Sequence, residues 1–281
     1  MNYRHAYHAG NGADVLKHVA LVALLEHLCK KTAPFCYLDT HAGRGMYPLG
    51  APETQRAGEF RDGIAKLLGD GEGAPAAVAR YLEVVRGLGA EDGALVRYPG
   101  SPALALSLLR PADRAVLVEM HHGEATALRS LTRTDSRAQV HERDGHEALL
   151  ALIPPKEKRG VVLIDPPYED PVEFTRLEAT ILAACHRWST GIFAVWYPIK
   201  QGDAALRFVT RMAASGLRRQ LLIELTHEQD DLPGGLNGSG LLVINPPYQF
   251  DQAMRNCLPW LHRHLSHEGR GRNRVIWSVP E

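Results

Sequence analysis

The segment Val161-Val-Leu-Ile-Asp-Pro-Pro-Tyr168 decides the fold class of this chain. Four consecutive apolar residues, three of them β-branched, predict a short strand that is buried on both faces. Two prolines cannot continue a helix or a central strand, so the strand ends at Ile164 and Asp165 stands at its carboxyl end. Strands buried on both faces belong to parallel sheets that helices cover on both sides. The segment therefore predicts an α/β protein with an acidic residue at the sheet edge.

The flanking sequence alternates strands and helices, as such a sheet requires. Short apolar runs predict seven strands, at residues 35–38, 115–118, 138–140, 161–164, 192–196, 220–225 and 241–244. Helical spacing of apolar residues predicts an amphipathic helix at 14–30 and further helices at 101–109, 123–132, 147–152, 171–187, 204–215 and 250–265. No helical pattern separates the last two strands, so we expect them to close the sheet as an antiparallel hairpin.

Residues 50–98 have a different character. They are rich in glycine, alanine and charged residues, and they contain two helix-like pieces joined by Gly69-Asp-Gly-Glu-Gly73. We interpret them as a small helical insertion. Residues 1–49 and 99–281 then form the catalytic domain, and the motif Gly100-Ser-Pro102 restarts it with a helix that Ser101 caps.

The composition limits the class of protein. The chain has 281 residues, with 32 basic and 32 acidic side chains, so the overall charge gives no support for nucleic-acid binding. No apolar run is long enough to cross a membrane, and the first residues lack a signal-peptide core, so we expect a cytoplasmic protein. The four cysteines form no CxxC pair and are interpreted as buried free thiols of a reducing compartment. We also expect no metal and a monomer.

Polar residues follow several of the predicted strands at the same sheet edge. The first strand runs into Asp39-Thr-His-Ala-Gly-Arg-Gly45, the second into Glu119, and the third is followed by Asp144-Gly145. A glycine loop lets the backbone approach a ligand closely, and an acid after the second strand can accept hydrogen bonds from a ribose diol. Taken alone, the loop is equally typical of a plain strand-to-helix turn, and Asp144 equally of a helix cap.

Asp165-Pro-Pro-Tyr168 is the more specific motif. An adenine N6 amine is a poor nucleophile, and two acceptors, the Asp165 carboxylate and the Pro166 carbonyl, can bind its two protons. Tyr168 can then stack on the base, which must leave the nucleic-acid stack to be modified. With the glycine loop and the ribose-binding acid, these residues predict methyl transfer from S-adenosyl-L-methionine to adenine N6.

A second copy of this motif, Asn245-Pro-Pro-Tyr248, follows the seventh predicted strand. Because it lies two strands beyond the first copy, we interpret it as a structural turn. Near the N-terminus, Tyr3-Arg-His-Ala-Tyr-His8 mixes aromatic and cationic side chains of the kind that contact RNA. Lys17 and His18 could line the cofactor pocket, although their spacing alone favours a solvated helix face.

With these residues in place, the chain resembles the bacterial 23S ribosomal RNA adenine-N6 methyltransferases of the RlmJ family over nearly its whole length. The resemblance is carried by residues 3–11, 13–18, 37–43, 98–102, 163–168, 196–198 and 277–280. Arg44 departs from the pattern, because a smaller residue is expected there. The resemblance implies a Rossmann-like class I methyltransferase fold and N6-methylation of a single adenine in 23S rRNA before the ribosome is fully assembled.

The same resemblance implies functional residues. Asp165 is the expected proton acceptor, with Pro166 and Tyr168 beside it, and Tyr3 and Arg4 are expected to contact the RNA. The residues expected to bind S-adenosyl-L-methionine, taken from the resemblance and from the motifs above, are Lys17, His18, Asp39, His41, Gly43, Ser101, Glu119, Asp144, Gly145 and Asp165.

Three other functions remain open at this level. A DNA adenine-N6 methyltransferase needs a DNA-reading domain, for which the sequence shows no helix-turn-helix or zinc-finger pattern. A protein glutamine N5-methyltransferase would use Asn245-Pro-Pro-Tyr248. A non-enzymatic RNA-binding protein would bind no cofactor.

Overall fold

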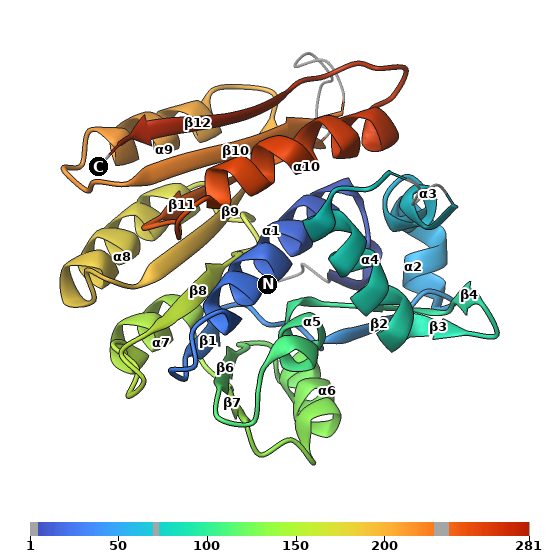
Figure 1. The fold of residues 1–281 in the computed structure, drawn as a ribbon, viewed down its shortest axis with the longest axis horizontal. Helices are drawn as coiled ribbons and strands as arrows, with labels where there is room; N and C mark the ends of the chain where they lie inside the picture. Colours follow the sequence, from blue (N-terminus) through green and yellow to red (C-terminus); the bar gives the residue numbers. More distant parts are fainter. Residues whose placement is uncertain (1–4, 70–72, 228–235, 281) are drawn as a thin grey trace.

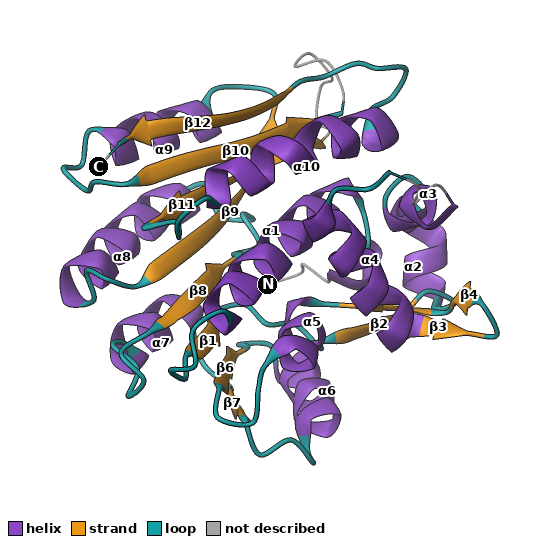
Figure 2. Ribbon diagram, viewed as in Figure 1, coloured by secondary structure: helices purple, strands orange, loops and turns teal. Residues whose placement is uncertain are grey.

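A large twisted sheet forms the centre of the molecule (Figures 1 and 2). The computed structural model describes residues 5–69, 73–227 and 236–280. The sheet has eight strands in the order β12-β10-β11-β9-β8-β1-β6-β7. Their bounds are β1 Cys36–Asp39, β6 Arg114–Val118, β7 Ala138–His141, β8 Gly160–Ile164, β9 Ile192–Lys200, β10 Gln220–Thr226, β11 Leu236–Ile244 and β12 Asn273–Val279.

The strand directions divide the sheet into two parts. From β7 to β9 all neighbours are parallel, and β11 is antiparallel to both β9 and β10. The expected antiparallel pairing of β10 and β11 is therefore confirmed, but these two strands do not close the sheet, because β12 lies outside them. The strand count of seven was wrong by one, because β12 adds an eighth strand antiparallel to β10. As an edge strand with little buried surface, β12 gives only a weak apolar signal in the sequence.

Helices cover both faces of the sheet. On one face α1 (Gly12–Cys29), α5 (Ser101–Leu108) and α10 (Phe250–Leu265) contribute to one apolar cluster, which also includes Leu128 of α6 (His122–Thr132). On the other face α7 (Gly145–Leu152), α8 (Glu173–Arg187) and α9 (Ala204–Ala213) contribute to a second cluster. The structure is thus the expected α/β fold, a mostly parallel sheet between two helical layers.

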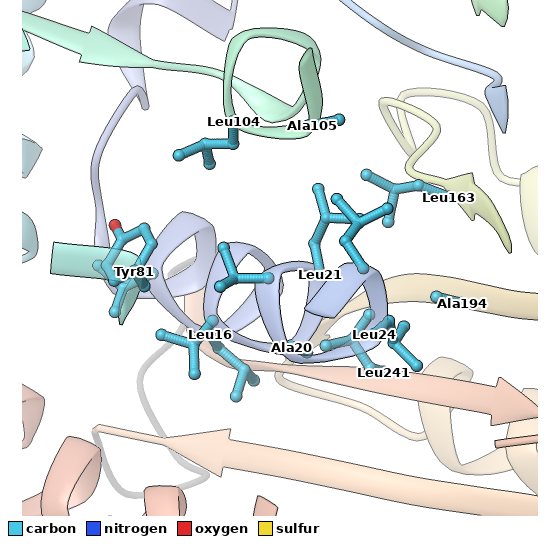
Figure 3. Packing of buried hydrophobic residues seen from close by; sticks show 14 of the residues in the cluster. Leu16, Ala20, Leu21, Leu24, Tyr81, Leu104, Ala105, Leu163, Ala194 and Leu241 are labelled. Carbon is cyan, nitrogen blue, oxygen red and sulfur yellow. The ribbon is translucent and has the colours of Figure 1, made fainter. Parts of the chain in front are cut away.

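Helix α1 lies in the centre of the first layer. Figure 3 shows its side chains Leu16, Leu21 and Leu24 among residues of α5 and of three strands. The helix is buried nearly all round, and its buried residues include the charged Asp14 and Lys17. The predicted amphipathic character was therefore wrong, because α4 (Ala76–Gly89) and α10 cover the side of α1 that the sheet leaves open.

Residues 50–98 fold mainly as helices, of which α4 packs against α1. These are α2 (Pro52–Ala57), η2 (Glu59–Arg61), α3 (Ile64–Gly69) and α4 (Ala76–Gly89). Two small two-stranded sheets accompany them, β2 (Met46–Pro48) with β5 (Arg97–Pro99) and β3 (Ala90–Glu91) with β4 (Ala94–Leu95). The one between β2 and β5 joins the two ends of this segment. The 3-10 helix η1 (His5–Tyr7) contacts α2.

Cys36, Cys185 and Cys257 are buried free thiols as expected, whereas Cys29 is only half-buried. Within the described part of the chain, no helix has the length and apolarity to span a bilayer. The same residues contain no group of three or more histidine, cysteine or acidic side chains arranged to hold a metal ion.

Candidate active site

The site lies beside β1, where the order in which the chain adds strands to the sheet changes from one side to the other. Strand β1 pairs with β6 on one side and with β8 on the other, both in parallel. Crevices form at such a point beyond the carboxyl ends of the strands. Asp39 ends β1, Asp165 follows β8 and Glu119 follows β6, so the topology brings these three acids to one edge.

The loop after β1 bends sharply around two glycines. Gly43 and Gly45 have φ angles of 61° and 81°, which side chains rarely tolerate. A Cβ at Gly43 would lie 2.2 Å from the hydroxyl of Tyr47. The amide of Gly43 donates a 2.8 Å hydrogen bond to Glu119 Oε2, and Arg44 forms two 2.8 Å bonds with Glu124. The departure at Arg44 thus ties the loop to α6.

Asp39 stabilises the start of this loop through a hydrogen bond from the amide of His41. Its carboxylate is fully buried and accepts hydrogen bonds from Tyr37 Oη (2.6 Å), Ser101 Oγ (2.7 Å) and the amide of His41 (3.2 Å). Burial raises the pKa of Asp39 to about 6, although these donors lower it. We expected Ser101 to be the N-cap of α5, and this was wrong. Gly100 occupies the N-cap position, and the Ser101 hydroxyl donates to Asp39 instead.

A buried chain of ionic contacts leads from α1 to Asp165. Lys17 Nζ lies 2.8 Å from Asp14 Oδ1 and 2.5 Å from Asp165 Oδ2. Asp14 also contacts His5 Nε2 and the amide of Gly10, each at 2.9 Å. Burial alone would lower the pKa of Lys17, but the two carboxylates raise it well above its usual value. Lys17 is therefore a buried cation, and the solvated helix face that its spacing favoured was wrong.

Two cavities meet at this ion pair. Both are lined by His5, Lys17, Asp165 and Pro167. The first, which we call the loop cavity, is also lined by His18, His41, Ala42, Gly43, Tyr47, Gly100, Ser101, Glu119, Met120, His121 and Glu124. The second, which we call the outer cavity, has a volume of about 470 Å³ and is also lined by Pro166, Tyr168, Trp196, Lys200 and residues of the N-terminal segment. Asp165 thus contributes to the wall of both.

Two histidines of the loop cavity are neutral at physiological pH. Burial lowers the pKa of His18 to about 3, and burial together with His146 lowers that of His41 to about 3. Gly145 makes room for the His41 ring, because a Cβ there would lie 2.9 Å from it. A neutral imidazole offers one donor and one acceptor, so both rings are suited to polar ligands without charge repulsion.

The tetrapeptide after β8 is rigid and strained. Tyr168 has a φ of 52°, an uncommon conformation for a bulky residue. Its hydroxyl donates to the carbonyl of Trp196 at 2.5 Å, and its ring packs on Phe174 with centroids 4.8 Å apart. Backbone strain of this kind persists where the surrounding structure enforces it, often at functional sites.

Other candidates lie outside both cavities. Asp144 caps α7 by accepting from the Glu147 amide (3.0 Å) and also contacts Arg176 (2.8 Å), so the alternative of a helix cap is confirmed. Asp39, Asp144 and Gly145 do not line either cavity, and their contact with a cofactor stays a prediction. Tyr3 and Arg4 fall outside the described residues.

The second tetrapeptide lies at the opposite edge of the sheet. Because β11 is antiparallel to β9, Ile244 pairs with Phe193 at the start of β9, whereas Ile164 pairs with Val195 further along it. The Asn245 amide donates to the carbonyls of Ser189 and Gly191. Asn245 therefore holds a turn.

Sequence reasoning missed several residues of the site. Asp14 was noted only for its place at the start of α1, and Tyr47, Glu124 and Lys200 were not singled out. Asp14 gave the strongest available signal, since an acid three residues before a lysine on an apolar helix indicates a buried pair.

Comparison with known proteins agrees with this geometry. Residues 32–279 match the family model described as ribosomal RNA large subunit methyltransferase D, RlmJ. Two proteins named ribosomal RNA large subunit methyltransferase J, from Escherichia coli and Haemophilus influenzae, are 43% and 40% identical over the full length of both chains. A crystal structure from Legionella pneumophila superposes with a TM-score of 0.89 at 35% identity, covering 96% of this chain and 98% of that one. The chain belongs to the RlmJ family of methyltransferases.

Proposed function

We propose that this protein transfers a methyl group from S-adenosyl-L-methionine to the N6 of one adenine in 23S ribosomal RNA. The observation that carries the proposal is the position of Asp165, which lies in the wall between the loop cavity and the outer cavity. A group that must bind an amine beside a methyl donor needs such a position. The relatives named as large-subunit rRNA methyltransferases support the choice of substrate.

The loop cavity suits S-adenosyl-L-methionine. Its lining contains the close backbone approach at Gly43 and the strand-end acid Glu119, whose free lone pairs suit a ribose diol. His18 Nε2 is buried and has no hydrogen-bond partner among the described residues, which fits a site built for a polar ligand. The cavity measures about 80 Å³, so binding has to displace side chains at its rim, where Met120 is 57% exposed.

The bound cofactor supplies an electrophilic methyl group on a positively charged sulfur. The protein supplies the acceptors. Asp165 and the carbonyl of Pro166 bind the two N6 protons, which directs the nitrogen lone pair out of conjugation and toward the methyl carbon. Asp165 would take the proton that N6 releases when it is methylated. Lys17, whose Nζ lies 2.5 Å from Asp165 Oδ2, holds this carboxylate at the wall that the two cavities share.

The outer cavity suits the extruded adenosine. At about 470 Å³ it lies within the range of small-molecule sites. Its lining combines Tyr168, Trp196 and Pro198 with cationic and imidazole side chains such as Lys200 and His8, and it also contains the acids Asp14, Glu59, Asp62 and Asp165. Aromatic faces stack on bases and basic groups contact phosphates, so this mixture is appropriate for a single nucleotide and its flanking backbone.

The test is methyl transfer from labelled S-adenosyl-L-methionine to protein-free 23S rRNA, with wild type, Asp165→Ala and Asn245→Ala in parallel. We expect N6-methyladenosine at one site with the wild type and with Asn245→Ala, and a loss of at least about 100-fold with Asp165→Ala, the usual size of a missing proton acceptor. Transfer that survives in Asp165→Ala and disappears in Asn245→Ala would instead support the glutamine methyltransferase.

DNA and protein acceptors belong in the same assay. Methylation of an adenine-containing DNA duplex in preference to rRNA would show that the proposed substrate is wrong and the proposed reaction is right. If calorimetry detects no binding of S-adenosyl-L-methionine, the only remaining alternative is that the protein binds RNA without catalysing a reaction.

A further inference from the structure

Three buried aromatic side chains form a hydrogen-bonded row behind the loop cavity. His18 Nδ1 lies 2.7 Å from the hydroxyl of Tyr98, and that hydroxyl lies 3.0 Å from the hydroxyl of Tyr81. All three residues are at most 1% exposed. Tyr98 comes from β5 and Tyr81 from α4, and Figure 3 shows Tyr81 beside α1, the helix that carries His18.

The direction of these hydrogen bonds follows from the number of donors. Each tyrosine hydroxyl has one proton to donate. If His18 Nδ1 donated to Tyr98, Tyr98 would donate to Tyr81, and the Tyr81 proton would have no acceptor among the described residues. If Tyr81 donates to Tyr98 and Tyr98 donates to His18 Nδ1, every hydroxyl proton is paired. The second arrangement leaves only the imidazole proton without a partner in the row, and His18 lines the loop cavity, where a ligand can accept that proton, whereas Tyr81 lines neither cavity. The second arrangement is therefore the favoured one.

This direction fixes the state of the imidazole. With Nδ1 acting as an acceptor, the single proton of the neutral ring must reside on Nε2. Burial, which lowers the pKa of His18 to about 3, keeps the ring neutral in the physiological range. His18 lines the loop cavity, and its Nε2 is the buried atom without a partner among the described residues.

We propose that Tyr98 and Tyr81 are positioning residues that hold His18 as the Nε2–H tautomer, so that it presents a neutral hydrogen-bond donor to an acceptor atom of the cofactor. The inference rests on the proposed function, because it deepens the cofactor site. It also gives residues 50–98 a part in that site, since Tyr81 is the far end of the row. A His18 held as the other tautomer would present a lone pair and repel an acceptor.

The first test is the tautomer itself, in the protein without ligand. Two-bond ¹H–¹⁵N correlation spectra of histidine-labelled protein distinguish Nδ1–H from Nε2–H rings, and comparison with His18→Asn assigns the signal. We expect wild-type His18 to be the Nε2–H tautomer, and Tyr98→Phe to lose this single form. A wild-type His18 protonated on Nδ1 would overturn the proposal, whatever the activity.

The second test is binding of S-adenosylhomocysteine, followed by calorimetry. We expect Tyr98→Phe to weaken binding about tenfold, the usual size of one lost buried hydrogen bond, and Tyr81→Phe to weaken it less, because Tyr98 keeps its own proton. Tyr197→Phe is the matched control, since its hydroxyl also forms a buried 2.7 Å bond, to Glu224, away from both cavities. Wild-type affinity in Tyr98→Phe would overturn the proposal.

The two tests separate this inference from the function on which it rests. If wild type fails to bind S-adenosylhomocysteine, the cofactor assignment fails, while the spectra of the ligand-free protein still decide the tautomer. If binding is normal and the tautomer is Nδ1–H, the cofactor assignment stands and the role of the two tyrosines is overturned.

Discussion

At the scale of single residues, the shape of the loop cavity depends on the lack of a side chain at Gly43. Gly43 combines a φ of 61° with a Tyr47 hydroxyl 2.2 Å from where a Cβ would lie, so any other residue requires Tyr47 or the loop to move. We expect Gly43→Ala to lower the free energy of unfolding by about 1–3 kcal/mol and to weaken S-adenosylhomocysteine binding, because Tyr47 lines the loop cavity and the Gly43 amide bonds to Glu119. Urea unfolding and calorimetry measure the two effects.

Gly93→Ala is the matched control for Gly43→Ala. Gly93 also has a positive φ, 82°, but a Cβ there meets no atom within 4 Å. It therefore reproduces the backbone strain without the collision, and we expect it to leave cofactor affinity unchanged. Equal effects of the two substitutions on affinity would show that contact with Tyr47 does not shape the cavity.

The sequence predicted the position of a residue correctly where that position depends on residues next to it in the chain. Asp165-Pro-Pro-Tyr168 was placed correctly because two prolines fix a turn wherever they occur. Lys17 was misplaced because its burial depends on Asp165, which is 148 positions away. A lysine is almost never buried without such a partner, and the spacing of residues on a helix gives no sign of a partner from another element.

At the scale of elements, η2 anchors the N-terminal segment of the site. Glu59 accepts 2.9 Å hydrogen bonds from His8 Nδ1 and Asn11 Nδ2, and Asn11 caps α1. The bond to Glu59 raises the pKa of His8 above 6.5. Burial alone would raise the pKa of Glu59, but His8 and Asn11 hold it below 4.5. Between pH 4.5 and pH 6.5, His8 and Glu59 are therefore both charged.

The sign of each shift gives the pH dependence of this anchor. Stability from His8 is present below pH 6.5 and is lost as the pH rises through its folded pKa, whereas stability from Glu59 is present above pH 4.5 and is lost on acidification. We expect Glu59→Gln to destabilise the protein most at about pH 5.5 and least at about pH 8.5, measured by urea unfolding. The effect is modest, because both side chains are more than a third exposed.

Glu83→Gln, which removes an exposed carboxylate paired with Arg80 on α4, is the control for Glu59→Gln. Its partner Arg80 stays charged at both pH values, so the effect of Glu83→Gln should be the same at both. A Glu59→Gln effect that is the same at both would contradict the charged pair with His8.

Element directions explain why the two similar tetrapeptides have different surroundings, as their order in the sequence indicated. The two tetrapeptides look alike, and only the antiparallel course of β11 sends Asn245 to the edge opposite Asp165. Alternation of apolar runs predicted the parallel half of the sheet, because each strand there is buried on both faces. It missed β12, whose residues Arg274 and Ser278 interrupt the apolar pattern of an edge strand.

At the scale of the whole molecule, the buried histidines couple folding to pH. His18 and His41 have pKa values of about 3 in the folded protein, because burial disfavours their charged forms, against 6.5 when unfolded. Between these values the unfolded chain binds more protons, so stability falls as the pH falls from 6.5 toward 3. Asp39 acts in the opposite direction, since burial raises its pKa to about 6 and the folded protein keeps its proton longer. The net slope is therefore smaller than two histidines would give.

A single substitution isolates one of these contributions. His41→Gln removes one titrating group and leaves Asp39 and His18 in place, so we expect the free energy of unfolding to depend less steeply on pH by one proton. That difference is about 1.4 kcal/mol per pH unit between roughly pH 6 and pH 4. Urea unfolding of both proteins across this interval measures it, with His262→Gln, a half-buried histidine of α10 outside both cavities, as the control. Parallel curves for wild type and His41→Gln would mean that His41 takes up its proton without unfolding.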